Sequence, residues 1–253
     1  MSYNTCIMEQ AGCGTDNKAF EFDEGLALKP AFRMFSRGAG NSGWSEFFAS
    51  KPAVTYRKGS VVVAQGEENA NIFYIVRGLV EYTHTGEDGS ETVLEILGPC
   101  NMLNLQPVFG HNPSIATFAA LSECILASAD KKEILGLIAR DNTLALEMLE
   151  EMAFIIGGLN RRLPMGTERS DIRTLRVIHM IAMIHRRVYG EKDPIFIRLS
   201  QSDLARIIQT TRVTISKILS DLKKKGVIKT DYGGIYITDM DLLTQYVKNG
   251  SSV

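Results

Sequence analysis

The segment 199–226 constrains the fold most, because it predicts two short helices joined by a tight turn. Its sequence is LSQSDLARIIQTTRVTISKILSDLKKKG. Ser200 and Asp203 have the S-x-x-D spacing that caps the start of a helix. Apolar residues then recur at helical spacing, and a polar break at 209–211 separates them from a second apolar series. This pattern is typical of a helix-turn-helix.

The second predicted helix runs from about 212 to 225 and has two different faces. Its buried face carries Ile215, Ile218, Leu219 and Leu222. The other face carries Arg212, Val213, Ser216 and Lys217, which are short or basic residues near the helix start. A recognition helix needs this arrangement, because its first turns enter the major groove of DNA and reach base edges. We therefore predict these four residues to read bases.

Charge is distributed unevenly along the chain. Residues 161–229 contain 16 Lys and Arg against 6 Asp and Glu, whereas residues 1–160 contain 11 against 20. A basic segment that coincides with a helix-turn-helix predicts double-stranded DNA as the partner of the C-terminal part.

The four cysteines are Cys6, Cys13, Cys100 and Cys124, and no two form a C-x-x-C pair. Structural zinc and a secreted disulfide framework are therefore not expected. No signal peptide and no apolar run of membrane-spanning length are present in the sequence, so we expect a cytoplasmic protein. The sequence predicts no catalytic residues, no metal site and no cofactor.

Short β-rich runs separated by glycines fill residues 56–127. Asp88-Gly89 lies between two such runs, 80–85 and 92–97, and is a strong hairpin signal. Further runs at 115–121 and 124–127 continue the pattern. The fold class is therefore predicted as α+β, with an N-terminal antiparallel β-roll of the jelly-roll type.

A helical region follows the β-rich part and predicts a homodimer. Its apolar stripe has the spacing of a coiled-coil seam. The predicted seam residues are Ala145, Met148, Met152, Ile155 and Leu159. Leu163-Pro164, which follows this helix, is predicted to form a hinge. Beyond it, a helix at 171–189 and a hairpin of strands 227–230 and 235–238 complete a winged helix-turn-helix.

These elements predict four regions. Residues 1–45 form a partly flexible N-terminal segment, and 46–136 form an effector-sensing β-roll. Residues 137–164 contain the dimerisation helix and the hinge, and 165–253 form the DNA-binding domain.

A glycine-punctuated roll, a long helix and a C-terminal winged helix together resemble the CRP/FNR superfamily of dimeric bacterial transcription regulators. The roll signature is present as Gly59, Gly66-Glu67 and Gly78, and the recognition-helix core as Arg212-Val-Thr-Ile-Ser-Lys217. The resemblance implies a palindromic promoter site and RNA polymerase as a further partner. By position, the residues that hold DNA phosphates are Ser202, Thr211 and Thr214.

Two departures from the family pattern carry information. Gln209 occupies the turn position where glycine is usual, which implies modest backbone strain. Val213 stands where glutamate usually accepts a hydrogen bond from cytosine, and valine suits a thymine methyl group instead. We therefore predict an A·T-rich, TTAA-like half-site. The run 213–216 resembles the CprK-type branch that regulates halorespiration, which implies a halogenated or otherwise substituted phenol as effector.

The segment 98–118 decides which effector is expected. Family members that bind cyclic AMP carry a glutamate and an arginine here, whereas this segment contains no acid and no base except His111. A small apolar or aromatic ligand is predicted instead; an equally acceptable interpretation is that these residues only fill the roll. The predicted pocket residues are Asn101, Met102, Leu103, Asn104, Leu105, Phe109, Phe118, Met148 and Met152.

Other sensing chemistries are weaker alternatives. Haem could be ligated by His84 or His111, and a thiol switch or an iron–sulfur cluster would have to use Cys6 and Cys13. A cupin-like enzyme is the last alternative, but the roll lacks the clustered histidines that such a metal site requires.

Overall fold

The computed structural model describes residues 43–149, 152–153, 169–189 and 194–249. The chain divides into two compact units. We call the described part of the first, residues 43–149 and 152–153, the roll domain, and that of the second, 169–189 and 194–249, the winged domain.

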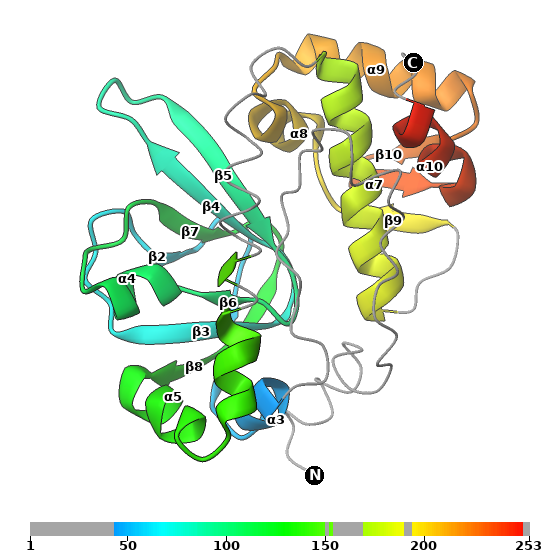
Figure 1. Cartoon of the computed structure of the whole chain (residues 1–253). Helices are drawn as coiled ribbons and strands as arrows, with labels where there is room; N and C mark the ends of the chain where they lie inside the picture. Colours follow the sequence, from blue (N-terminus) through cyan, green and yellow to red (C-terminus); the bar gives the residue numbers. More distant parts are fainter. Residues whose placement is uncertain (1–42, 150–151, 154–168, 190–193, 250–253) are drawn as a thin grey trace. The chain divides into compact units, whose positions relative to one another are not determined.

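The roll domain contains two antiparallel four-stranded sheets with short helices at their ends (Figure 1). One sheet has the strand order β1-β8-β3-β6 and the other β2-β7-β4-β5. The elements are α3 (Gly43–Ala49), β1 (Ala53–Tyr56), β2 (Val61–Val63), β3 (Asn71–Arg77), β4 (Val80–Thr85), β5 (Glu91–Leu97), β6 (Met102–Leu103), α4 (Leu105–Gly110), β7 (Thr117–Ala120), β8 (Cys124–Asp130) and α5 (Lys131–Ile138). Residues 142–149 are also helical.

Two hydrophobic cores lie on opposite faces of the β1-β8-β3-β6 sheet. The inner core is shared by both sheets and includes Phe73, Ile75, Leu103 and Phe118. The outer core is covered by α3, α5 and the helical segment 142–149. Its buried residues are Trp44, Phe48, Ile72, Tyr74, Val76, Cys100, Met102, Leu105, Val108, Ala127, Ala129, Ile134, Leu144 and Met148. Strand β3 supplies both cores, because successive side chains of a strand point to opposite faces.

Gly78 shows why the roll needs glycine between β3 and β4. Its φ is +93°, a conformation that side chains rarely adopt. A Cβ at this position would also lie 2.3 Å from the Glu123 carbonyl oxygen. The chain therefore reverses here only because residue 78 has no side chain.

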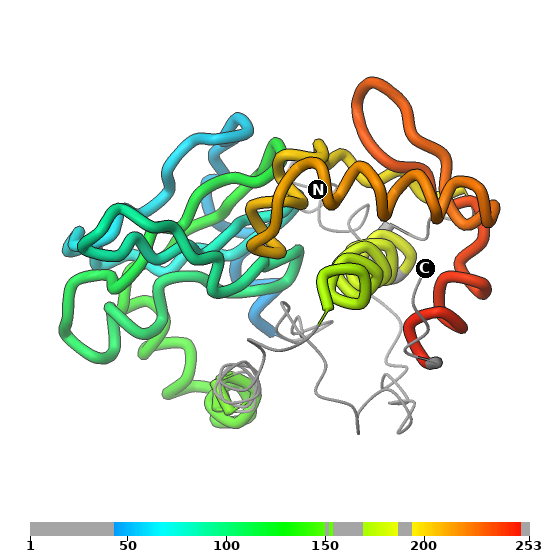
Figure 2. Tube along the Cα trace, turned by 90° about the horizontal axis from the view of Figure 1, so that it is seen from above, coloured from blue at the N-terminus to red at the C-terminus, as the bar shows by residue number. Residues whose placement is uncertain are grey.

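The winged domain packs four helices around a small sheet. Its elements are α7 (Ser170–Tyr189), β9 (Ile195–Ile197), α8 (Gln201–Ile208), α9 (Arg212–Lys224), β10 (Ile228–Asp231), β11 (Gly234–Ile237) and α10 (Met240–Asn249). The sheet is antiparallel with the order β10-β11-β9. The hairpin of β10 and β11 projects from the domain beside α9, as the orange-red loop in Figure 2 shows.

The structure confirms the predicted roll and winged helix and adds elements that the sequence pattern did not reveal. Helix α4 lies within the segment 98–118, where most of the pocket residues are predicted, and β9 and α10 extend the winged domain. Residues 43–45, the end of the predicted N-terminal segment, belong to helix α3. The rest of that segment, 1–42, and the hinge at 163–164 lie outside the described residues.

Candidate nucleic-acid interface and effector pocket

The helix-turn-helix is formed by α8, a three-residue turn and α9. Ser200 and Asp203 form the predicted capping box: the Ser200 hydroxyl accepts from the Asp203 N–H, and the Asp203 carboxylate accepts from the Ser200 N–H. Gln209 ends α8 in the left-handed conformation, with φ 56° and ψ 57°. Its N–H still donates to the carbonyls of Ala205 and Arg206. A residue with a side chain thus makes the turn that glycine would make without strain.

The N-terminal half of α9 presents the predicted base-reading residues to solvent. Arg212, Val213, Ser216 and Lys217 are all exposed. Val213 is 65% exposed although it is apolar. The opposite face carries Ile215, Ile218, Leu219 and Leu222, which are buried in the domain core. Packing therefore fixes the orientation of the helix and leaves one polar and basic face outside.

The three predicted phosphate-binding residues lie at the starts of the two helices. Thr211 is the N-cap of α9, and its hydroxyl accepts from the Thr214 N–H at 3.1 Å. The hydroxyls of Thr211 and Thr214 also lie 2.9 Å apart. Ser202, in the first turn of α8, is exposed. Hydroxyls near helix N-termini have the chemistry that phosphate contacts require.

A surface concavity of about 360 Å³ lies between α9 and the start of α7. It is lined by Arg169, Ser170, Asp171, Thr214, Lys217, Ile218 and Asp221. An Arg169 guanidinium nitrogen lies 2.7 Å from Asp171 Oδ2, and Lys224 Nζ lies 3.2 Å from Asp221 Oδ1. Sequence reasoning missed Arg169 and Ser170, because they lie about 40 residues before α9 in the chain.

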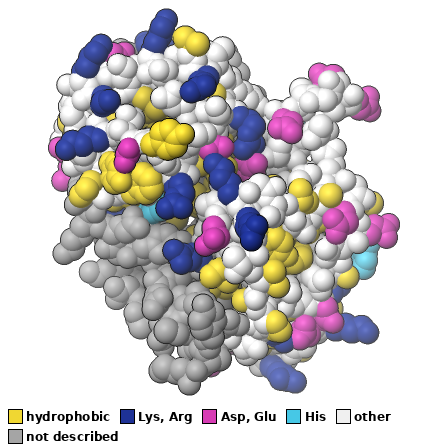
Figure 3. Space-filling view, turned by 180° about the vertical axis from the view of Figure 1, so that it is seen from behind, with side chains coloured by type: hydrophobic (Ala, Val, Ile, Leu, Met, Phe, Trp, Pro, Cys, Tyr) yellow, Lys and Arg dark blue, Asp and Glu magenta, His cyan; other side chains and the backbone are white. Residues whose placement is uncertain are grey.

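The turn is also joined to α7. The Thr210 hydroxyl donates to the Ser170 hydroxyl at 3.4 Å, and an Arg173 guanidinium nitrogen donates to the same oxygen at 3.4 Å. The face of the molecule drawn in Figure 3 carries many Lys and Arg side chains on the winged domain. The excess of Lys and Arg over Asp and Glu in this part of the sequence is therefore visible at the surface.

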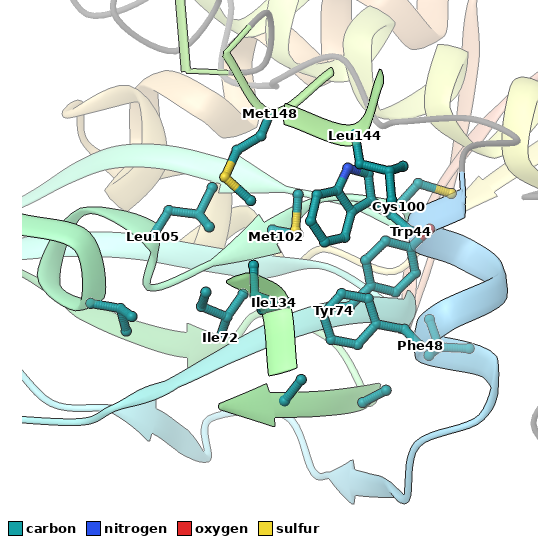
Figure 4. Close-up of a cluster of buried hydrophobic side chains, with 14 residues drawn as sticks. Trp44, Phe48, Ile72, Tyr74, Cys100, Met102, Leu105, Ile134, Leu144 and Met148 are labelled. Atoms are coloured by element: carbon teal, nitrogen blue, oxygen red, sulfur yellow. The ribbon is translucent and has the colours of Figure 1, made fainter. Parts of the chain in front are cut away.

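The structure divides the predicted effector pocket between the two cores. Met102, Leu105 and Met148 belong to the outer core, and Phe109 and Met152 pack against it. Figure 4 shows Met148 extending toward Leu105 and Met102, near Trp44. Leu103 and Phe118 instead belong to the inner core. Met102 and Leu103 are neighbours on β6, and the alternation of a strand sends them to opposite faces.

The two asparagines of the predicted pocket are buried and bind the backbone. The Asn101 carboxamide oxygen accepts from the Gly98 N–H at 3.0 Å. The Asn104 amide donates to the carbonyls of Asn69 and Asn71, at 2.9 Å each. Asn104 also has a positive φ of 67°, a conformation that asparagine tolerates better than most residues. Both side chains therefore hold the loop around β6 in place.

The predicted dimer seam also has a different environment from the one expected. Met148 is 7% exposed because it packs in the outer core of its own domain, and Ala145 and Met152 are half-buried. The exposed apolar residues of this helical segment are Leu146 and Leu149, at 62% and 61%. Ile155 and Leu159 lie outside the described residues. Periodicity alone cannot distinguish a dimer seam from a face that packs on its own domain.

The histidines and cysteines of the roll have mainly structural contacts. His84 Nδ1 lies 2.8 Å from the Ile115 carbonyl oxygen, and His111 Nε2 lies 3.2 Å from Lys131 Nζ. Cys124 is a buried free thiol, and burial raises its pKa to about 11. Cys6 and Cys13 lie outside the described residues. Within the described ranges, no group of three or more potential metal ligands is found.

A capped helix-turn-helix with an exposed basic face, following a double-sheet roll, defines a two-domain DNA-binding regulator. Comparison with family models agrees. Residues 53–141 match the cyclic nucleotide-binding domain, and residues 175–246 match the Crp-like helix-turn-helix domain. The chain belongs to the CRP/FNR family of bacterial transcription regulators.

Relatives of known function are transcription regulators rather than enzymes. The chain is 24% identical over 196 residues to a CRP-like cAMP-activated global transcriptional regulator of Mycobacterium tuberculosis, covering 76% of this chain and 86% of the relative. It is 23% identical over 181 residues to the cAMP-activated regulator CRP of Salmonella typhimurium, covering 68% and 83%. The prediction that the chain is not an enzyme is confirmed.

Solved structures share the fold. FixK2 from Bradyrhizobium japonicum superposes with a TM-score of 0.64 at 15% identity, covering 77% of this chain and 96% of that one. A CooA mutant from Carboxydothermus hydrogenoformans gives 0.58 at 18% identity, covering 82% and 91%. CprK complexed with OCPA gives 0.57 at 18% identity, covering 83% and 97%. In the described part of the chain, no helix has the length and apolar character needed to cross a membrane.

Proposed function

We propose that the chain is a cytoplasmic regulator that binds a palindromic, A·T-rich promoter site as a homodimer. The observation that carries the proposal is the exposed face of α9, where Arg212, Val213, Ser216 and Lys217 are presented together. Arginine and lysine bind guanine or phosphate oxygens, and valine can contact only an apolar group such as a thymine methyl. RNA polymerase, as the further partner that the family resemblance implies, would act at the same promoter.

The DNA-binding experiment starts from a selection of duplexes that the full chain retains from a random pool. The selected site is expected to be a palindrome with half-sites one helical turn apart, because two recognition helices of a dimer contact one face of DNA. Alanine at Arg212 or Lys217 should reduce affinity for the selected site by about 1–3 kcal/mol if the residue reads a base. Lys248→Ala, which removes one positive charge from α10, is the control.

Equal losses on selected and random duplexes would assign Arg212 and Lys217 to phosphates instead. If the chain retains no duplex, either alone or with a substituted phenol or cyclic AMP added, the DNA-binding proposal is refuted.

Val213 gives a sharper test of the half-site. Val213→Glu should shift the selected half-site toward one that contains guanine, because a glutamate accepts from the N4 amine of the paired cytosine. The expected discrimination is about 1–3 kcal/mol per base pair. Val213→Ala is the control, since it removes the methyl contact without adding an acceptor. An unchanged selected sequence in Val213→Glu would contradict the thymine-methyl argument.

For the effector we propose a small aromatic ligand, such as a substituted phenol, rather than cyclic AMP. The site would lie where α4 and the helical segment 142–149 meet the outer core, next to Met102, Leu105 and Met148. Segment 98–118 offers no carboxylate and no guanidinium to a cyclic nucleotide. A buried phosphate without a paired cation is strongly unfavourable. The Lys131 ammonium, at the start of α5, donates to the Val108 carbonyl of α4 at 3.1 Å, so this hydrogen bond joins the two helices beside the proposed site.

Trp44 makes this site directly observable. It is the only tryptophan of the chain, and it is fully buried in the same core. A phenol that binds there should change the Trp44 emission saturably, whereas cyclic AMP should not. Met148→Ala should weaken the response to the phenol, and Leu103→Ala, in the inner core, serves as the control. A saturable response to cyclic AMP alone would refute the ligand class.

For the homodimer we propose a contact face displaced from the predicted seam. Leu146 and Leu149 are exposed and lie three positions apart in the helical segment 142–149, so they share one helix face. Leu149→Glu should convert the dimer to a monomer in sedimentation equilibrium. Leu135→Glu, at an exposed leucine of α5, should leave it dimeric. A Leu149→Glu chain that remains dimeric would place the interface elsewhere.

A further inference from the structure

Asn104, between β6 and α4, has one polar atom that the fold does not use. The residue is 1% exposed. Its amide nitrogen donates to the carbonyls of Asn69 and Asn71. Its carboxamide oxygen is buried as well, and no group in the described part of the chain donates a hydrogen bond to it. Because buried polar groups are nearly always paired, this acceptor requires an explanation.

The ordinary structural role of an asparagine oxygen at this position is absent. Asn104 is the N-cap residue of α4, and the side-chain oxygen of an N-cap residue usually accepts from an N–H of the first helical turn. The Asn104 side chain makes no such bond. Its φ of 67° is left-handed, whereas N-cap residues that bond the first turn have an extended backbone. The oxygen is therefore not needed to start the helix.

The carboxamide of Asn104 also cannot turn over to find a donor. Only its nitrogen can donate to the two carbonyls, and a turned group would bring its oxygen against both of them. The segment that carries these carbonyls is itself held. The Asn69 oxygen accepts from the Asn71 N–H at 2.9 Å, and the Asn69 amide donates to Glu67 Oε1 at 3.0 Å. The orientation of the Asn104 oxygen is thus fixed before any ligand binds.

Asn104 lies at the margin of the outer core, where the effector site is proposed. Strands β3 and β6 are antiparallel and pair as far as Phe73 and Leu103. Continuing this register by one residue places Asn104 beside Ile72. Ile72 and Leu105, the residue that follows Asn104, both belong to the outer core, and Figure 4 shows them there.

We infer that the Asn104 carboxamide oxygen accepts a hydrogen bond from the polar group of the effector. The inference rests on the proposed function, because it uses the effector site proposed above. An amide oxygen can only accept, so the ligand must donate. A neutral phenol has such a donor, whereas a phenolate, an ether or a hydrocarbon does not. Asn104 would therefore select un-ionised aromatic donors, because any other ligand leaves the buried oxygen unpaired.

The experiment titrates the full chain with 3-chlorophenol, 3-chloroaniline and 3-chlorotoluene and follows the emission of Trp44. The three ligands share the ring and the chlorine. They differ in one group, which is a donor in the first two and a methyl of similar size in the third. The two donors should bind about tenfold more tightly than 3-chlorotoluene, which is the loss expected when a buried acceptor stays unpaired.

Asn104→Gly assigns this preference to the carboxamide. Glycine adopts the positive φ of residue 104 without strain, so the variant removes the side chain and keeps the backbone. The preference for the two donors over 3-chlorotoluene should disappear in it. Asn112→Gly, at an exposed asparagine whose amide donates to the Gly110 carbonyl, is the matched control and should keep the wild-type preference.

The wild-type titrations decide the inference even if Asn104→Gly does not fold. If 3-chlorotoluene binds wild type as tightly as 3-chlorophenol does, the inference is overturned and the proposed site stands. A preference for donors that persists in folded Asn104→Gly would also overturn it, because another acceptor would then bind the hydroxyl. If none of the three ligands changes the Trp44 emission, the proposed effector site is refuted, and the inference with it.

Discussion

The turn of the helix-turn-helix stores strain that a single substitution should release. Gln209 has φ 56° and ψ 57°, and its side chain is exposed. The left-handed conformation costs a residue with a Cβ about 1–2 kcal/mol. Glycine avoids this cost but loses about 0.4–1 kcal/mol through the greater freedom of its unfolded chain. Gln209→Gly should therefore stabilise the winged domain by about 1 kcal/mol.

The assay is urea unfolding of the full chain, together with hydrogen exchange of the α8 and α9 amides, which reports on the turn locally. A gain of about 1 kcal/mol should also raise the Tm of a domain of this size by about 4–8 °C. Gln209→Ala is the control, because alanine keeps the Cβ and should give no gain, and Gln209→Asn should be intermediate. A glycine variant that is no more stable than the alanine variant would refute the reasoning.

Two further predictions concern stability. Burial, with a smaller effect of Lys248, lowers the pKa of His179 to about 4 from 6.5. Because the unfolded chain then binds the proton more tightly, stability should be complete above pH 6.5 and fall by up to about 3 kcal/mol as the pH drops to 4. In acid unfolding, His179→Gln should flatten this decline while keeping a donor toward Thr244, and an unchanged pH profile would assign the decline to other groups. Gly78→Ala should destabilise the roll domain by at least about 2 kcal/mol in denaturant unfolding; a neutral result would mean that the Glu123 carbonyl moves aside freely.

The sequence predicted best those structural features that a short segment determines by itself. The capping pair Ser200 and Asp203 and the left-handed turn at Gln209 are local features, and the structure contains both. Helix α10 carried a readable signal as well, since Met240, Leu243 and Val247 recur at i, i+3 and i+7 and are all buried.

The candidate effector pocket could not be derived in the same way. Met102 and Leu103 are adjacent and equally apolar, so only the strand geometry of β6 reveals that they enter different cores. The stripe that contains Met148 was ambiguous for a related reason, because a face packed on the domain has the same spacing as a seam. Arg169 was missed because its proximity to α9 is a tertiary contact.

Strand β3 has consequences for how this family member can evolve. Ile72, Tyr74 and Val76 fill one core, while Phe73 and Ile75 fill the other. Five consecutive positions are therefore closed to polar substitution, and even apolar replacements must preserve volume on both sides at once. Substitutions that change ligand preference are easier to accommodate in α4 and the segment 142–149, because these helices contact one core only. Among homologues, we expect β3 to vary least within the roll and these helices to carry the differences.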